Sequence, residues 1–221
     1  TVNEKKAITD LSLELKKGDF ATIIGSNGAG KTTVIKILST LLKADGGSAV
    51  VNGFNVATNG GNVRECISLT GQFVAVDEVL TGRENLTLIG QLKRLPNLKS
   101  AVNEWLSFSR LEDAANKRVS TYSGGMRRRL DIAMSLMGNP NVLFLDEPTR
   151  GIDVGAKYEI YQLIQKLAKE GKAIIMISSE MPELLGICDR VLVMRNGEIA
   201  GEMDVAEATQ EKIMSVIVGE Q

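Results

Sequence analysis

The sequence of 221 residues contains no histidine. Without an imidazole side chain, the protein cannot use Ser-His-Asp or Cys-His catalysis, bind a metal through imidazole, or use histidine as an acid or base. Any chemistry that the chain performs therefore depends on carboxylates, hydroxyls, lysine, backbone amides or a bound ion.

Cysteine is scarce, and an excess of positive charge is missing. The two cysteines, Cys66 and Cys188, lie far apart in the sequence and suit neither a disulfide framework nor a zinc cluster, which favours a reducing compartment. Lys and Arg together number 26, against 27 for Asp and Glu. Because proteins that bind nucleic acid by charge rely on a strong positive field, we expect no nucleic-acid partner.

Long apolar runs are absent as well. No run approaches the roughly 18 apolar residues of a membrane span, and residues 1–6 do not resemble a signal peptide. We therefore expect a soluble chain that reaches a membrane only through a partner. Its length suffices for one large domain with a substantial core.

Short apolar runs alternate with amphipathic segments along the chain. The runs predict strands at 20–24, 49–51, 67–69, 142–145 and 173–177. Helical spacing predicts helices at 32–42, 83–95, 101–108, 126–137, around the stripe 160–168, and at 207–218. Residues 191–194 and 198–201 predict a hairpin. The most apolar runs require a covered, mostly parallel sheet, so the sequence predicts an α/β core with a helical insertion.

The first motif directly follows the predicted strand 20–24 and consists of Gly25-Ser26-Asn27-Gly28-Ala29-Gly30-Lys31-Thr32. It matches the phosphate-binding pattern G-x-x-x-x-G-K-[ST] and opens a predicted helix, as that pattern requires. Glycines let backbone N–H groups point at phosphate oxygens. Lys31 would reach the β- and γ-phosphates, and the Thr32 hydroxyl would coordinate Mg²⁺. A glycine-rich turn that binds nothing is the alternative, but the complete match favours a nucleoside triphosphate site.

Two carboxylates, Asp146 and Glu147, directly follow the apolar run 142–145. In open α/β sheets, ligands bind at the carboxyl ends of strands. Asp146 is therefore placed to hold Mg²⁺ through water, and Glu147 to polarise the attacking water as a general base. An Asp-Glu pair alone is commonly a solvated turn, but the phosphate loop in the same chain favours the catalytic interpretation.

A second glycine-rich helix start comprises Ser123, Gly124 and Gly125. One chain is poorly suited to place both helix starts on one γ-phosphate, so we infer a sandwich of two subunits, each offering this serine to the other's nucleotide. Ser-Gly-Gly by itself is often only a helix cap. For the three arginines at 127–129, the sequence favours a solvated helix face over a phosphate-binding or partner-binding patch.

In order and spacing, these motifs resemble those of an ATP-binding cassette (ABC) ATPase over nearly the whole chain. The resemblance to the nucleotide-binding subunit of an ABC transporter rests on residues 25–32, Gln72, 122–126 and 145–148. It implies an α/β fold with a P-loop NTPase core, a mostly parallel sheet, an antiparallel β part and a helical subdomain. It also implies a single domain, with 1–71 and 141–221 as the core and about 72–140 as the helical subdomain.

The same resemblance implies further roles. Gln72 is similar to the glutamine that contacts Mg²⁺ and hinges the helical subdomain, and Asp153 to the aspartate that communicates across the dimer. Thr33 joins the nucleotide-binding residues. The segment from Phe73 to Asn85 would face an integral membrane transporter subunit. We expect ATP and Mg²⁺, an ATP-dependent homodimer or a heterodimer with another cassette, and a peripheral position at the cytoplasmic face of the cell membrane.

Two positions depart from the family pattern. Ser179 stands where the family carries a histidine, and Val2 where an aromatic residue would stack on adenine. A serine hydroxyl can bind the γ-phosphate but cannot titrate, which could cost roughly 10²–10⁴ in rate. Two hypotheses follow: an ATPase with Glu147, Lys31, Gln72 and Ser179 as the catalytic candidates, or an ATP-gated dimerising module with little hydrolysis.

Two branches of the family are represented. Up to about Pro148 the chain resembles daunorubicin-resistance-type exporter ATPases, and from Thr149 it is similar to the second cassette of ribose- and galactose-type sugar importers, where serine at 179 is usual. This change predicts a mosaic sequence, natural or engineered, with a junction near Pro148–Thr149. Because the exporter features include the partner-facing segment 73–85, drug or lipid export is favoured over sugar import.

Overall fold

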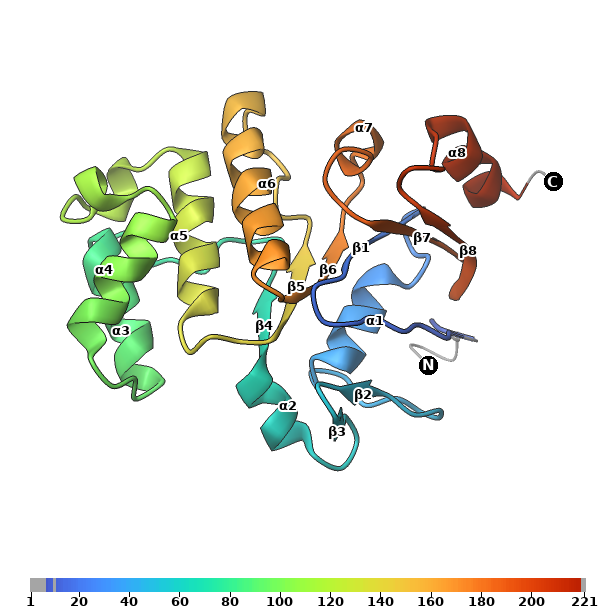
Figure 1. The fold of residues 1–221 in the computed structure, drawn as a ribbon, viewed down its shortest axis with the longest axis horizontal. Helices are drawn as coiled ribbons and strands as arrows, with labels where there is room; N and C mark the ends of the chain where they lie inside the picture. The colour runs from blue at the N-terminus through green and yellow to red at the C-terminus, as the bar shows by residue number, and fades with distance from the viewer. Residues whose placement is uncertain (1–6, 10, 220–221) are drawn as a thin grey trace.

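A six-stranded sheet with the order β4-β5-β6-β1-β7-β8 forms the centre of the computed structural model, which describes residues 7–9 and 11–219 (Figure 1). The first five strands in that order are parallel, and β8 pairs antiparallel with β7. In spatial order they are β4 (Ile67–Thr70), β5 (Val142–Asp146), β6 (Ala173–Ile177), β1 (Phe20–Gly25), β7 (Arg190–Arg195) and β8 (Glu198–Asp204). The predicted α/β class with a mostly parallel sheet is confirmed.

Helices cover both faces of this sheet. They are α1 (Lys31–Leu38), α2 (Gly60–Cys66), α5 (Gly124–Leu136), α6 (Val154–Lys169), α7 (Met181–Leu184) and α8 (Gln210–Val218). Alternate residues of β1 point to opposite faces: Ile24 packs in the core that contains Ile164 of α6, and Ile23 in the core that contains Ile35 of α1. Burial on both faces explains why the strands are continuous apolar runs.

A helical arm extends beyond the β4 edge of the sheet, at the left of Figure 1. It contains α3 (Gly82–Leu92), α4 (Leu98–Phe108), α5 and two short 3₁₀ helices, η1 (Glu112–Ala114) and η2 (Val119–Thr121). Leu86, Leu106 and Leu130 belong to its own apolar core, whereas Ile132 of α5 packs into the core of the sheet. The helical insertion is therefore present, and α5 joins it to the sheet. The proposed domain limits stay a prediction.

A small antiparallel part is formed by β2 (Val50–Val51) and β3 (Phe54–Asn55). Their turn residues, Asn52 and Gly53, both have positive φ angles, 50° and 82°. Two successive left-handed residues give the tight hairpin turn whose twist matches that of the strands. Strand β3 is too short to be recognised from apolar periodicity.

The helix predicted at 32–42 ends earlier, at Leu38. Thr40 has a φ of 65°, which a right-handed helix cannot contain, and the N–H groups of Leu41 and Leu42 both bind the Lys36 carbonyl. Leu41, which the pattern placed on the apolar face, is 63% exposed. The prediction for residues 39–42 is therefore wrong, because turn geometry overrides the apolar spacing there. Helix α2 was not predicted, since its two leading glycines disfavour a helix.

Candidate active site

Four predicted functional segments follow strands of the sheet and meet at the carboxyl ends of those strands (Figure 1). Gln72 follows β4, Glu147 follows β5, Ser179 follows β6, and the phosphate loop follows β1. These strands are parallel neighbours, so their carboxyl ends lie at the same end of the sheet. Topology thus brings together segments that are far apart in the sequence.

The path of the phosphate loop (residues 25–32) requires glycine at two places. A Cβ at Gly25 would lie 2.1 Å from the carbonyl oxygen of Met194, and one at Gly30 would lie 2.6 Å from that of Ala7. Gly30 also has a φ of 104°, in the left-handed region. The loop is therefore held by close contact with neighbouring backbone, and no larger side chain fits at either position.

The loop presents its tip and the start of α1 to solvent. Ser26, Asn27 and Gly28 are exposed, whereas Ala29 is buried and its carbonyl accepts a hydrogen bond from the N–H of Gly197 at 3.0 Å. The first N–H groups of a helix have no partner within that helix. Those of residues 31–33 can therefore bind an anion together with the loop, aided by the positive potential of the helix end.

Lys31 turns back over the loop. Its Nζ donates to the carbonyl oxygens of Gly25 at 2.7 Å and Ser26 at 3.0 Å. Burial lowers the pKa of Lys31, while the nearby charges of Glu147 and Asp146 act in the opposite direction. The ammonium group therefore lies between the loop and the acidic pair, where a phosphate group would meet it.

Thr32 and Asp146 form a pair of oxygen ligands suited to Mg²⁺. The Thr32 hydroxyl donates to Asp146 Oδ2 at 3.2 Å. Mg²⁺ prefers oxygen ligands and commonly takes only one or two from the protein, with water and phosphate completing the shell. Within residues 7–9 and 11–219, no group of three or more His, Cys, Asp and Glu could hold a metal by itself. The residues thus fit a metal ion that arrives together with phosphate oxygens.

Glu147 has a backbone conformation that the sequence did not reveal. Its φ is 50°, and its N–H donates to the Ile177 carbonyl at 3.0 Å. A non-glycine residue in this region costs about 1–3 kcal/mol and is often found at functional sites. Both the N–H and the hydroxyl of Ser179 donate to Glu147 Oε2, at 3.2 Å and 3.1 Å. The carboxylate of Glu147 thus points to Ser179, the position at which the sequence departs from the expected pattern.

Ser123 and Asp153 occupy equivalent places at the starts of α5 and α6. The Ser123 hydroxyl accepts from the Met126 N–H at 3.2 Å, and Asp153 Oδ1 accepts from the Ala156 N–H at 3.0 Å. The two helix starts touch, because a Cβ on Gly125 would lie 2.4 Å from that of Ala156. In Figure 1 the starts of α5 and α6 lie toward the helical arm, apart from the start of α1.

The arginines at 127–129 do not form a solvated face, and that prediction is wrong. The exposed fraction of the side chain is 33% for Arg127, 12% for Arg129 and 2% for Arg128. Arg128 points into the protein and binds the backbone beside exposed Gln72. The sequence shows three successive charges, but only the packing of α5 against the sheet decides which of them is buried.

The segment proposed to face a membrane partner, Phe73 to Asn85, is apolar and exposed at its start. Phe73 is 84% and Val79 is 73% exposed. Asn85, by contrast, is 1% exposed; it accepts from the Asp77 N–H at 2.9 Å and donates to the Thr81 carbonyl at 3.0 Å. Asn85 therefore stabilises the backbone of residues 77–81 from the interior, while the side chains of Phe73 and Val79 are exposed to solvent.

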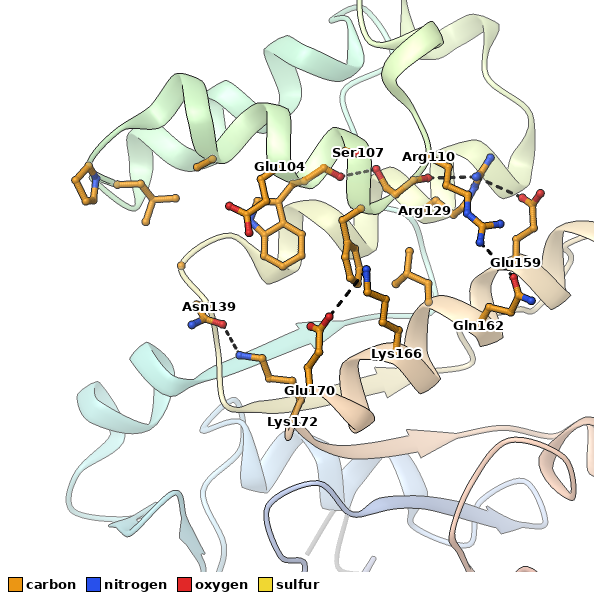
Figure 2. Close-up of a pocket in the computed structure, with 18 residues that line it drawn as sticks. Glu104, Ser107, Arg110, Arg129, Asn139, Glu159, Gln162, Lys166, Glu170 and Lys172 are labelled. Carbon is orange, nitrogen blue, oxygen red and sulfur yellow. Dashed lines mark hydrogen bonds and ion pairs between the residues drawn. The ribbon is translucent and has the colours of Figure 1, made fainter.

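A cleft of about 960 Å³ lies between α4, α6 and the loop after α5 (Figure 2). There the rings of Trp105 and Phe108 meet edge to face, and Lys166 Nζ lies 4.5 Å from the Phe108 centroid. None of the predicted site residues lines this cleft. A phosphate loop binds by backbone N–H groups on an open surface, so the candidate site does not depend on a deep cavity.

Three other sequence predictions bear on the site. The position of Val2 lies outside the described residues. Cys66 and Cys188 are both free thiols. Among the residues that the structure describes, no helix is both long enough and apolar enough to cross a bilayer.

The chain is similar to ATP-binding proteins of drug resistance and of sugar import. A daunorubicin resistance ATP-binding protein of Streptomyces coeruleorubidus is 39% identical over 220 residues, which cover 99% of this chain and 67% of that protein. A putative ribose/galactose/methyl galactoside import ATP-binding protein of Halalkalibacterium halodurans is 38% identical over 235 residues, covering 96% of this chain and 43% of that protein. Both matches continue across Pro148, and the mosaic origin stays a prediction.

The chain spans 60–68% of the length of the drug-resistance relatives. A solved ATP-binding cassette dimer in a post-hydrolysis state, bound to ADP and phosphate, is 25% identical with a TM-score of 0.80, and the match covers 93% of this chain and 94% of that one. Residues 8–150 match the ABC transporter family. The chain therefore belongs to the ABC transporter family, as an ATP-binding subunit that resembles the daunorubicin-resistance ATPases.

Proposed function

We propose that this chain binds and hydrolyses MgATP at the carboxyl ends of β1, β4, β5 and β6, and that hydrolysis powers transport through a membrane partner. One observation carries the proposal. The phosphate loop with Lys31, the Thr32–Asp146 pair and the Glu147–Ser179 pair occupy the ends of adjacent parallel strands. That arrangement provides a phosphate cradle, a metal site and a general base in one place.

In this proposal, the N–H groups of residues 25–33 bind the phosphates. Lys31 exchanges its two carbonyl contacts for phosphate oxygens, since its Nζ already lies over the loop. Thr32 and Asp146 hold Mg²⁺, the Asp146 carboxylate through water, and Gln72 adds a ligand from the end of β4. The ion would neutralise phosphate charge that develops during the reaction.

Glu147 is the general base of the proposed reaction. Its Oε2 accepts two hydrogen bonds from Ser179, so Oε1 is the oxygen that takes the proton from the attacking water. Ser179 thus acts on the carboxylate instead of titrating, and it positions the base without an imidazole. This role favours hydrolysis over the ATP-gated module.

A second cassette completes the proposed site. Ser123, Gly124, Gly125 and Asp153 lie on the adjoining starts of α5 and α6, away from the chain's own phosphate loop. A second subunit, placed head to tail, would bring these residues to the nucleotide. The partner is a second copy or another cassette.

The membrane partner would dock on exposed apolar residues of the helical arm, at the cytoplasmic face of the membrane. They include Phe73 and Val79 of the proposed docking segment, which are 84% and 73% exposed. The exporter-like character of segment 73–85, together with the similarity to the drug-resistance relatives, favours drug or lipid export. Sugar import is the second candidate, favoured by the similarity to the import protein and by Ser179.

Steady-state phosphate release from MgATP tests the proposal. Glu147→Gln keeps the size of the side chain but removes the base, so we expect release to fall by roughly 10²-fold or more while ATP still binds. The matched control is Glu104→Gln, an exposed residue of α4, which should match wild type. If wild type releases phosphate no faster than Glu147→Gln, the chain is an ATP-gated module.

A further inference from the structure

The buried guanidinium of Arg128 binds the backbone on two sides of the candidate active site. Its Nη1 donates to the carbonyl oxygen of Gly71 at 2.8 Å, and its Nε donates to that of Pro148 at 2.7 Å. Gly71 directly precedes Gln72, and Pro148 directly follows Glu147. One side chain of α5 therefore joins the ends of β4 and β5 next to the metal-ligand candidate and the general base.

Asp131 extends this connection along α5. Its Oδ2 accepts from Arg128 Nη1 at 3.0 Å, and its Oδ1 accepts from the backbone N–H of Ala75 at 3.0 Å. Residues 72–74 therefore lie between two anchored backbone atoms, Gly71 O and Ala75 N. The same helix fixes the chain on both sides of Gln72.

Both charged groups lie in the interior, with exposed side-chain fractions of 2% for Arg128 and 8% for Asp131. Burial lowers the pKa of Arg128 and raises the pKa of Asp131, while the charge of each opposes the effect on the other. Apolar residues of similar volume often stabilise a fold as well as or better than a buried ion pair. The backbone contacts of this pair therefore indicate a role beyond stability.

We propose that Arg128 and Asp131 are positioning residues for ATP hydrolysis, which hold the backbone at Gln72 and at Glu147 at a fixed separation. The inference rests on the proposed function, since it explains how the residues of that site are held in position. Phe73, 84% exposed, lies inside the anchored segment. A partner that displaces Phe73 therefore strains the backbone between the two anchored atoms, Gly71 O and Ala75 N.

The double variant Arg128→Met/Asp131→Leu tests the inference. It removes both charges together, so no unpaired charge remains in the interior, while the carbonyls of Gly71 and Pro148 and the N–H of Ala75 lose their partners. We expect the thermal midpoint to fall, because three backbone groups lose their partners. The KM for ATP should stay close to wild type, and kcat should fall on the order of 10–100-fold, as small misplacements near a reacting centre can cause. Amide hydrogen exchange in residues 71–76 should become faster.

Two further variants sharpen the experiment. Arg127→Met removes a charge from the same helix, but Arg127 pairs with the exposed Glu78, so this control should keep wild-type kcat and exchange. Arg128→Lys keeps the charge opposite Asp131 but lacks the forked N–H groups, so it should show the same lower kcat and faster exchange. It also decides the question if the double variant does not fold.

Wild-type kcat in Arg128→Lys or in the folded double variant would overturn the inference. A lower kcat without faster exchange in residues 71–76 would overturn it too, because the pair would not act through this segment. Failure of the proposed function is seen separately, when Glu147→Gln and wild type release phosphate equally. In that case exchange alone decides: a faster rate supports the anchoring role, and an unchanged rate rejects it.

Discussion

At the scale of single residues, Ser179 shows how the chain manages without histidine. It donates twice to Glu147 Oε2, through its N–H and its hydroxyl. Hydrogen bonds to a carboxylate are stronger than those between neutral groups and fix its orientation. In the proposed site, Ser179 therefore contacts the carboxylate assigned as the general base through groups that do not titrate.

Ser179→Ala is expected to lower kcat for ATP hydrolysis by about tenfold, because a hydrogen bond to a charged group contributes about 1.5–3 kcal/mol and the backbone N–H still donates. Steady-state phosphate release at saturating MgATP measures the effect. Ser120→Ala, at an exposed position of η2, serves as the control. Equal rates for Ser179→Ala and wild type would show that the hydroxyl does not position Glu147.

At the scale of elements, the close contact of α5 with α6 sets the face that carries Ser123 and Asp153. Gly125 and Ala156 meet so closely that even one added methyl group would collide, at 2.4 Å. Each helix start is capped by its own side chain, which holds Ser123 and Asp153 in place. The second glycine of the Ser-Gly-Gly motif is therefore explained by packing, which its sequence pattern alone does not show.

Gly125→Ala is expected to lower the thermal midpoint by several degrees, since overpacking costs about 1–3 kcal/mol and each kcal/mol shifts a domain of this size by about 2–4 °C. The double variant Gly125→Ala/Ala156→Gly moves the methyl group to the facing helix and should recover most of the loss. Calorimetry compares the three proteins. If Gly125→Ala has the wild-type midpoint, α5 and α6 can move apart to fit the methyl group without a loss of stability.

At the scale of the whole molecule, the starts of α5 and α6, which carry Ser123 and Asp153, lie apart in space from the start of α1, which follows the phosphate loop (Figure 1). In the proposed head-to-tail dimer, each subunit would contribute its phosphate loop to one site and Ser123 to the other. The Lys157–Glu180 ion pair connects α6, which starts beside Asp153, with the loop that carries Ser179.

Glu147→Gln with MgATP is expected to sediment at twice the mass of the nucleotide-free protein, because bound ATP joins the two subunits and is not hydrolysed. Adding Ser123→Arg should keep ATP binding but abolish the dimer, since a large side chain would block the interface. Sedimentation with and without MgATP measures both. A dimer that persists with Ser123→Arg would contradict the head-to-tail arrangement.

The α/β class, the phosphate loop and the acidic pair are predictable from the amino-acid order alone, because each depends on local patterns: apolar runs, glycine spacing and strand-end carboxylates. The left-handed conformation of Glu147, the burial of Arg128 and the early end of α1 became visible only in the folded chain. These features depend on contacts between segments distant in sequence. Local patterns carry no information on such contacts, because packing of the whole chain selects them.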